Sequence, residues 1–121
     1  MRKIVNQGPI SIEADDLDAE NGNASHEYIM SWPEPDGEGG YFVTENVVRF
    51  QRGPVKEVGV NGVTNEALFA VVIDRLEKFQ AGPFACAENA SALWYLKGAL
   101  RKLDERTAKR VARGVEGTKV K

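Results

Sequence analysis

The sequence predicts an α+β fold, with a small N-terminal antiparallel sheet of about three strands or more followed by a C-terminal two-helix hairpin. Alternating and β-branched segments fill the first half, whereas apolar residues recur at helical spacing in the second half. The length of 121 residues fits one domain with a small core, so oligomerisation is expected. We expect a single domain over residues 1–121, with a sheet part at 1–63, a helical hairpin at 64–114 and a C-terminal loop at 115–121 that closes the site described below.

Three segments of the first half are predicted strands, at residues 9–14, 27–32 and 41–50. The first alternates apolar and polar residues, and the third is rich in aromatic and β-branched residues. Pro33 and Pro35 are expected to end the second strand, and a glycine-rich hairpin connection follows them. The order of these strands along the chain favours an antiparallel meander.

The first predicted helix has Thr64 as its expected N-cap and runs to Gln80. A Gly82-Pro83 step then provides a strong stop signal. The apolar residues that recur at helical spacing in this segment are Leu68, Val71, Val72, Leu76 and Phe79.

The second predicted helix begins at residues 85–87 and ends near Arg113, before Gly114 at a position where helices commonly end. Trp94 and Tyr95 lie off its apolar stripe and are expected to form a second interface, with the sheet or with a neighbouring subunit. The stripe itself consists of Leu93, Leu96, Leu100 and Leu103.

Several classes of protein are excluded by composition. Cys86 and His26 are the only residues of their types, so no disulfide framework or Cys/His zinc site is expected, and no catalytic residue, metal or cofactor is expected. No apolar run approaches the roughly 20 residues of a membrane span, and the N-terminus lacks the apolar core of a signal peptide. The acidic run at residues 13–20 lacks the spacing of a calcium loop and is expected to be solvated.

The charge of the chain is unevenly distributed. The net charge of −2 disfavours general binding of DNA. However, residues 1–66 carry 5 Lys and Arg against 12 Asp and Glu, whereas residues 67–121 carry 11 against 6. The basic second half can therefore attract an acidic first half within an oligomer, or an anionic ligand.

An arginine row extends the leucine stripe of the second helix. Arg106, Arg110 and Arg113 follow at helical spacing, and the stripe reaches Asn89 in the other direction. Guanidinium groups suit phosphate, and the backbone N–H groups of Gly117 and Thr118 offer further donors. A solvated basic face, paired with nearby carboxylates, is an equally weighted alternative from spacing alone.

Phe79 and Phe84 are the aromatic candidates for stacking on a nucleobase beside such a site. A core role is favoured for Phe84, whereas the two roles are evenly weighted for Phe79 because it lies next to the Gly-Pro turn.

Three stretches of the chain resemble a known family. They are residues 50–66, residues 74–84 and the C-terminal combination of Arg106-Thr107, Arg110 and residues 112–118. Together they are similar to the Thoeris anti-defence sponge proteins of phages, first type, over about residues 41–118. Each stretch alone is a weak signal, whereas the combination is specific.

This resemblance implies a non-enzymatic protein. Such proteins bind and sequester cyclic ADP-ribose isomers, the alarm signals of a bacterial TIR-domain protein, in the cytoplasm of the infected host. The resemblance further implies assembly into homo-oligomers up to hexamers, with the signal pocket between two subunits. Some members also hold cyclic di- or trinucleotides at a separate site.

The resemblance also assigns roles to individual residues. The adenine would stack on Phe79, Asn89 would lie in the pocket, and Arg106 and Arg110 would grip the pyrophosphate and ribose. The C-terminal loop at 116–120 would close the site. The ligand-binding residues expected in this chain are Phe79, Asn89, Arg106, Arg110, Arg113, Gly117, Thr118 and Val120, of which Arg113 comes from the arginine row alone.

Two other interpretations stay open. A phosphodiesterase that degrades the same signal would need a general base or a metal near the arginines, where Asp104 and Glu116 are the nearby carboxylates. A protein-interaction module would use its basic helices to dock on an acidic partner, such as the first half of another copy.

Overall fold

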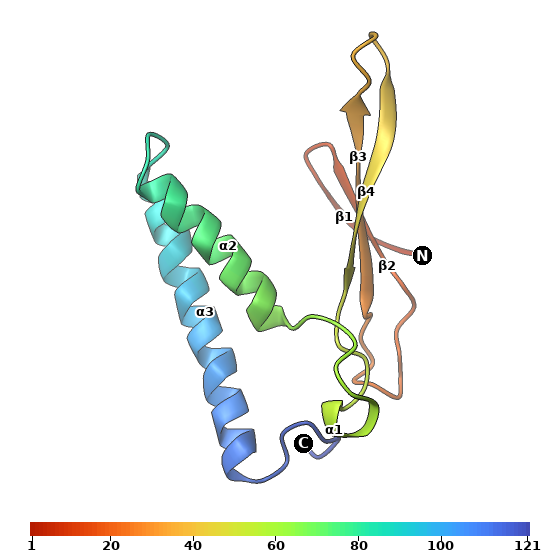
Figure 1. The fold of residues 1–121 in the computed structure, drawn as a ribbon, viewed down its shortest axis with the longest axis vertical. Helices are drawn as coiled ribbons and strands as arrows, with labels where there is room; N and C mark the ends of the chain where they lie inside the picture. The colour runs from red at the N-terminus through yellow and green to blue at the C-terminus, as the bar shows by residue number, and fades with distance from the viewer. The chain divides into compact units, whose positions relative to one another are not determined.

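The computed structural model describes residues 1–121 and confirms the α+β class, with a four-stranded antiparallel sheet followed by helices (Figure 1). The chain forms two compact units. We call the first the sheet unit (Met1–Gly53 and Val60–Gly62) and the second the helical unit (Pro54–Gly59 and Val63–Lys121). The prediction that these units act as a single domain stays a prediction.

The sheet has the order β1-β2-β3-β4, so each strand pairs with its neighbour in the sequence. The expected strands correspond to β2 (Ile10–Ala14), β3 (Glu27–Pro35) and β4 (Tyr41–Arg49). Strand β1 (Arg2–Gln7) was not predicted, because every one of its side chains is exposed and the segment lacks apolar alternation. A register shift between Lys3 and Val5 marks a bulge in this edge strand.

Strand β3 corrects the prediction that its prolines end it. The strand continues through Pro33 and Pro35, which pair with Val43 and Tyr41 of β4. Strand β2 pairs with β3 only as far as Ser31, so both prolines lie where β3 has a partner on one side. A proline is tolerated in such a segment because its missing N–H can face away from the single partner.

The acidic loop after β2 is more ordered than a solvated loop. The Asp15 carboxylate accepts hydrogen bonds from the backbone N–H groups of His26 (2.9 Å) and Glu27 (3.3 Å) and pairs with Arg52 (2.6 Å). His26 Nε2 lies 3.7 Å from Asp18 Oδ2. This network fixes the loop to the start of β3.

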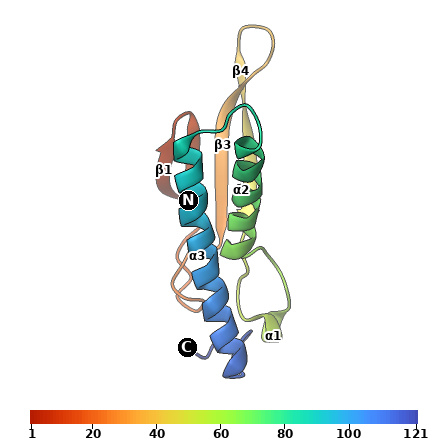
Figure 2. The same ribbon diagram turned by 90° about the vertical axis from the view of Figure 1, so that its left-hand side faces the viewer.

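The helical unit contains a short helix α1 (Val55–Val58) and the long helices α2 (Asn65–Gln80) and α3 (Ala87–Ala112). Thr64 is the N-cap of α2, as predicted, and its hydroxyl accepts a hydrogen bond from the Ala67 N–H. The thiol of Cys86 has the same role for α3. Helices α2 and α3 lie side by side as a hairpin (Figure 2). No helix is both long enough and apolar enough to cross a lipid bilayer.

The predicted apolar stripe agrees with the observed burial on α3 but only in part on α2. On α3, the predicted leucine stripe is partly buried and Arg110 continues it, with only 8% of its surface exposed. On α2, the prediction is wrong for Val71 and Val72, which are exposed. The buried residue of α2 is instead Ile73, which directly follows Val72 in the sequence.

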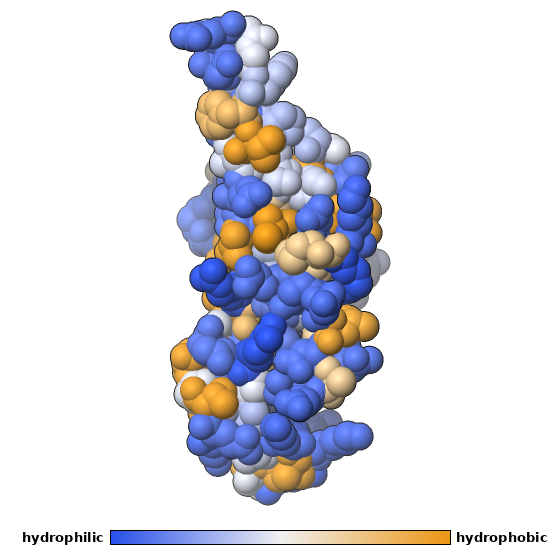
Figure 3. Space-filling view, turned by 90° about the vertical axis from the view of Figure 1, so that its right-hand side faces the viewer, coloured by the Kyte–Doolittle hydropathy of each residue, from blue (hydrophilic) through white to orange (hydrophobic).

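Burial is shallow in both units. No large side chain is fully buried, and the buried hydrophobic residues are Ala14 in the sheet unit and Ile73 in the helical unit. Large apolar side chains are exposed on both units, and Figure 3 shows orange patches between polar residues on one face. The exposed large apolar side chains include Tyr41, Phe42 and Val43 of β4 and Val71, Trp94, Tyr95 and Val111 of the helical unit. Such surface is typical of chains that associate.

Gly62 is expected to be intolerant of a side chain. A Cβ atom at this position would overlap the backbone carbonyl of Phe50. We expect Gly62→Ala to lower the free energy of unfolding of the sheet unit by about 2 kcal/mol. Urea unfolding followed by Trp32 fluorescence in a Trp94→Phe background measures this.

Gly98 in α3 has room for a side chain. In the isolated chain, a Cβ atom at this position would contact only an Arg101 side-chain atom, at 3.8 Å. Gly98→Ala is therefore expected to stabilise α3 by about 1 kcal/mol.

The stability of the sheet unit is expected to depend on pH through Asp15. Partial burial acts to raise the pKa of this carboxyl, but the two backbone donors and the charge of Arg52 outweigh it and hold the pKa below 3.8. A lowered carboxyl pKa stabilises the folded state above its unfolded value, and this stabilisation is lost as the pH falls through the folded value. Asp15→Asn should therefore lower the melting temperature at pH 7 and have much less effect near pH 3. An equal effect at both pH values would contradict this.

Candidate functional site

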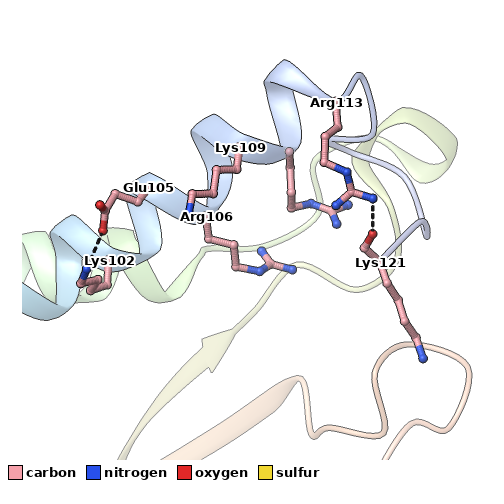
Figure 4. A pocket seen from close by; sticks show the side chains of 7 residues that line it. Lys102, Glu105, Arg106, Lys109, Arg113 and Lys121 are labelled. Atoms are coloured by element: carbon pink, nitrogen blue, oxygen red, sulfur yellow. Dashed lines mark hydrogen bonds and ion pairs between the residues drawn. The ribbon is translucent and has the colours of Figure 1, made fainter.

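A shallow basic depression of about 590 Å³ lies along the C-terminal half of α3 (Figure 4). Six of its seven lining residues are basic, which gives the surface a strongly positive character. The residues that line it are Lys102, Glu105, Arg106, Lys109, Arg110, Arg113 and Lys121. The predicted arginine row is therefore confirmed as one face of the helix.

Arg110 is the most constrained member of this row. Its Nε donates to the Glu116 carboxylate at 3.0 Å, and its terminal nitrogens donate to the backbone carbonyls of Val120 (2.6 Å), Val115 (2.9 Å) and Thr118 (3.2 Å). All three nitrogens are thus used within the chain, and the residue is 8% exposed. Its guanidinium holds the segment of residues 115–120, which we call the tail.

The tail also contacts α1. The Lys56 N–H donates to the Gly117 carbonyl at 3.0 Å, and both residues belong to the helical unit. Gly117 has φ +78°, and a Cβ atom there would lie 3.0 Å from Lys56 Cγ. Figure 1 shows the tail passing beside α1. No local pattern predicts this contact, because the two segments are far apart along the chain.

Arg106 and Lys109 differ from Arg110 in having no hydrogen bond or ion pair, and both are exposed. Arg106 and Arg113 extend from the same side of α3 (Figure 4), and Arg113 donates to the Lys121 carbonyl at 2.6 Å. Glu105 pairs with Lys102 at 3.1 Å rather than with an arginine. Among the cations that line the depression, Arg106, Lys109 and the ammonium group of Lys121 therefore have no partner.

The other predicted site residues lie where α2 meets α3. Phe79 is partly buried, contacts Phe84 edge-to-face at 6.1 Å between ring centroids, and has the Arg75 guanidinium 4.9 Å from its ring centroid. Asn89 donates to the Phe84 carbonyl at 3.3 Å. The preference for Phe84 as a core residue is wrong, since the turn leaves its side chain 71% exposed.

The two groups of predicted residues are not brought together within one chain. Asn89 lies in the first turn of α3, whereas Arg106 and Arg110 lie near its other end. At the α-helical rise, Asn89 and Arg106 are separated by about 25 Å along the axis of this rigid helix. This separation is greater than the length of a compact molecule about the size of a mononucleotide. One chain therefore presents two separate halves, an aromatic end and a basic end.

The comparison with known proteins decides the family. The model of the Acb2/Tad1 hairpin domain matches residues 45–108, which include α2 and most of α3. The chain belongs to this family. The matched region holds Phe79, Asn89 and Arg106, whereas Arg110 and the tail follow it.

A curated relative in this family is a protein named Thoeris anti-defense 1 from Bacillus phage SBSphiJ7. It is 58% identical over 71 residues, which is 59% of this chain and 50% of that protein. The chain therefore spans about half the length of the curated relative that it matches.

Sequence reasoning missed the lysines of the depression and the role of Glu116. Lys102, Arg106, Lys109 and Arg113 recur at steps of three and four, so the helical spacing that revealed the arginines also contains the signal for the lysines. The pairing of Glu116 with Arg110 depends on a turn after the helix, where Gly114 has φ +73°. Helical periodicity does not describe such a turn.

Asn89 is expected to contribute to stability as well as to the candidate site. Asn89→Ala removes the hydrogen bond to the Phe84 carbonyl and should lower the free energy of unfolding by about 1 kcal/mol. Urea unfolding followed by circular dichroism measures the effect. Ser91→Ala, at an exposed position on the same helix, is the control and should change stability by less than about 0.5 kcal/mol. Equal effects of the two substitutions would show that the Asn89 bond is unimportant.

Proposed function

We propose that this chain is a phage anti-defence protein that binds and sequesters a cyclic ADP-ribose isomer without cleaving it. The ligand would be removed from the Thoeris defence system of the infected bacterium, in the host cytoplasm. The observation that carries the proposal is the free guanidinium of Arg106 in a basic depression, in a chain of the Acb2/Tad1 hairpin-domain family. The name of the Bacillus phage relative supports the same function.

The chemistry of the depression suits a pyrophosphate. A guanidinium offers two parallel N–H donors to phosphate oxygens, and Lys109 adds a second positive charge close by. The aromatic end supplies what a nucleotide also needs, because the face of Phe79 can stack on adenine and Asn89 carries donor and acceptor atoms. Arg113, Gly117, Thr118 and Val120 would complete the basic end of the site.

We infer that two copies of the chain form each pocket. The aromatic and basic ends lie too far apart to hold one small ligand, so the aromatic end of one copy would meet the basic end of another. Exposed apolar side chains on the helical unit, such as Trp94 and Tyr95, provide surface for such association. A homo-oligomer, with a hexamer as the expected assembly, would contain several of these pockets.

Capture without cleavage is supported by the state of the carboxylates at the basic end. Glu105 and Glu116 are each paired with a cation, at 3.1 Å and 3.0 Å, whereas Asp104 has no such partner but does not line the depression. A general base needs a carboxylate or imidazole that can accept a proton from the attacking group. Paired carboxylates are poorly suited to that task, so the proposal assigns no catalytic residue.

Arg106 is expected to be essential for binding. Arg106→Gln removes the free guanidinium and should weaken the binding of a cyclic ADP-ribose isomer at least about tenfold, measured by isothermal titration calorimetry. Arg101→Gln makes the same change on the same helix outside the depression and should leave affinity within about twofold. Neither residue has a hydrogen-bond partner in the chain, so both variants should fold.

The fate of the ligand separates the alternatives. Nucleotide released from the heat-denatured complex should have the mass of the intact ligand. A changed mass would make the protein an enzyme, and an absence of heat with every isomer would favour a protein-interaction module. The same titration with a cyclic dinucleotide and a cyclic trinucleotide tests the second ligand class that the family resemblance implies.

A further inference from the structure

The outer edge of β4 is open to pairing with another strand. The sheet order places β1 and β4 at its two edges, and the two strands differ. Strand β1 begins with two cations and has a bulge between Lys3 and Val5, features that discourage pairing with a further strand. Strand β4 contains neither a proline nor a bulge, and it pairs with β3 in continuous register from Tyr41 to Arg49. It therefore presents a regular edge along its whole length.

Hydrogen bonds at the two ends of the β3–β4 hairpin show which residues bond to β3. The Phe50 N–H donates to the His26 carbonyl at 2.7 Å, and the Asp36 N–H donates to the Gly40 carbonyl at 3.0 Å. Hydrogen-bonded and non-hydrogen-bonded pairs alternate in an antiparallel ladder, so the even-numbered residues of β4 bond to β3. The odd-numbered residues direct their N–H and C=O groups to the free edge, and we call them the edge residues: Tyr41, Val43, Glu45, Val47 and Arg49.

The side chains of the edge residues suit a strand that pairs. All five project from the same face of the sheet, because alternate residues of a strand point the same way. All five are also exposed, and three of them are apolar. Glu45 has no hydrogen bond or ion pair, and Arg49 has only an exposed contact with Glu27 at 3.5 Å. Such an exposed, partly apolar edge is typical of strands that associate.

We infer that β4 of one copy pairs with β4 of a second copy, antiparallel about a two-fold axis at Val47. In this register Val47 faces Val47, and Glu45 of each copy faces Arg49 of the other. The symmetry therefore creates two pairs of opposite charge, and this complementarity identifies a second copy as the partner. A register in which Glu45 faces Glu45 would bring like charges together and is disfavoured.

This pairing closes at two copies. It uses the β4 edge of both sheets, and the bulged β1 edges discourage further addition. The interface lies in the sheet unit, which contains none of the candidate ligand-binding residues, so the inference does not rest on the proposed function. It would join the shallowly buried sheets of two copies, in addition to the association proposed for the helical units.

Amide hydrogen exchange, resolved to single residues by NMR on the full chain without ligand, tests the pairing. The Val47 N–H points to the free edge in one chain, whereas across the interface it would donate to Val47 of the other copy. Its exchange should be at least about tenfold slower than that of an unprotected amide. Exchange at the unprotected rate would overturn the inference.

Charge exchange tests the register. Glu45→Arg places two arginines face to face and should accelerate exchange of the Val47 amide at least about tenfold. Glu45→Arg combined with Arg49→Glu recreates the opposite-charge pairs and should return the rate to within about threefold of the original. The Val48 amide, which bonds to β3, should change by less than about twofold and reports that the sheet is folded. A double variant that stays unprotected while Val48 is unchanged would contradict the register.

Disulfide formation covers the case in which the charge variants do not fold. In a Cys86→Ser background, where serine can still cap α3, Val47→Cys would bring two thiols together at the axis. Facing residues of a hydrogen-bonded pair have Cα atoms about 5.5 Å apart, which a disulfide can span. Oxidised glutathione should therefore give a covalent dimer, measured by mass spectrometry.

Val43→Cys in the same background is the matched control. It lies on the same edge and face but would be opposite Gln51 of the other copy, so it should not form a dimer with itself. Equal cross-linking of the two variants would show random collision, and cross-linking of the Val43 variant alone would show a different register. Either result, or no cross-link in the Val47 variant, would overturn the inference.

Discussion

One continuous stripe along α3 organises the helical unit. In the middle of the helix it consists of leucines that pack against α2, and towards the C-terminus it continues through Thr107 to the buried Arg110. The change from leucine to arginine turns a packing face into a hydrogen-bonding face without changing the helical spacing. The same geometry that joins the two helices therefore also joins the helix to the tail, which in turn contacts α1 through Gly117.

The length of α3 sets the second constraint. An α-helix of 26 residues does not bend enough to bring its ends together, so Asn89 and Arg106 stay apart in every copy of the chain. A ligand that needs an aromatic face and a pair of cations cannot obtain both from one copy. Shallow burial in both units is consistent with this account, because surface that is exposed in one chain is available for another. Oligomerisation would then be part of the binding mechanism and would also stabilise the fold.

Local signals made much of the fold predictable. Thr64 preceding a periodic apolar segment located α2, and Gly114 after the arginine row located the end of α3, because caps and left-handed turns depend on nearby residues. Strand β1 and the continuation of β3 through Pro33 were missed, since both depend on which strand lies alongside. The exposure of Val71 was missed for a similar reason, because spacing gives a helical face but not its exact boundary.

The candidate site was predictable as a set of residues but not as an arrangement. Periodicity identified Arg106 and Arg110 as neighbours on one face, yet it could not show that the first is free and the second is held by the tail. That difference arises from carbonyl groups beyond the end of the helix, whose positions no pattern of side chains encodes. Position in the helices identified Phe79 and Asn89 as candidates, and family resemblance gave them roles. The structure adds that they lie at the opposite end of the hairpin.

The most direct test of the account is complementation between two binding-deficient variants. Phe79→Leu and Arg106→Gln would be mixed, unfolded and refolded together, and the binding sites for a cyclic ADP-ribose isomer would be counted by calorimetry. Each variant alone should lack tight binding. If every pocket takes its aromatic end from one copy and its basic end from another, random assembly should restore about a quarter of the sites. Recovery of no sites, in mixed oligomers verified by native mass spectrometry, would show that each pocket lies within a single chain and would contradict the account.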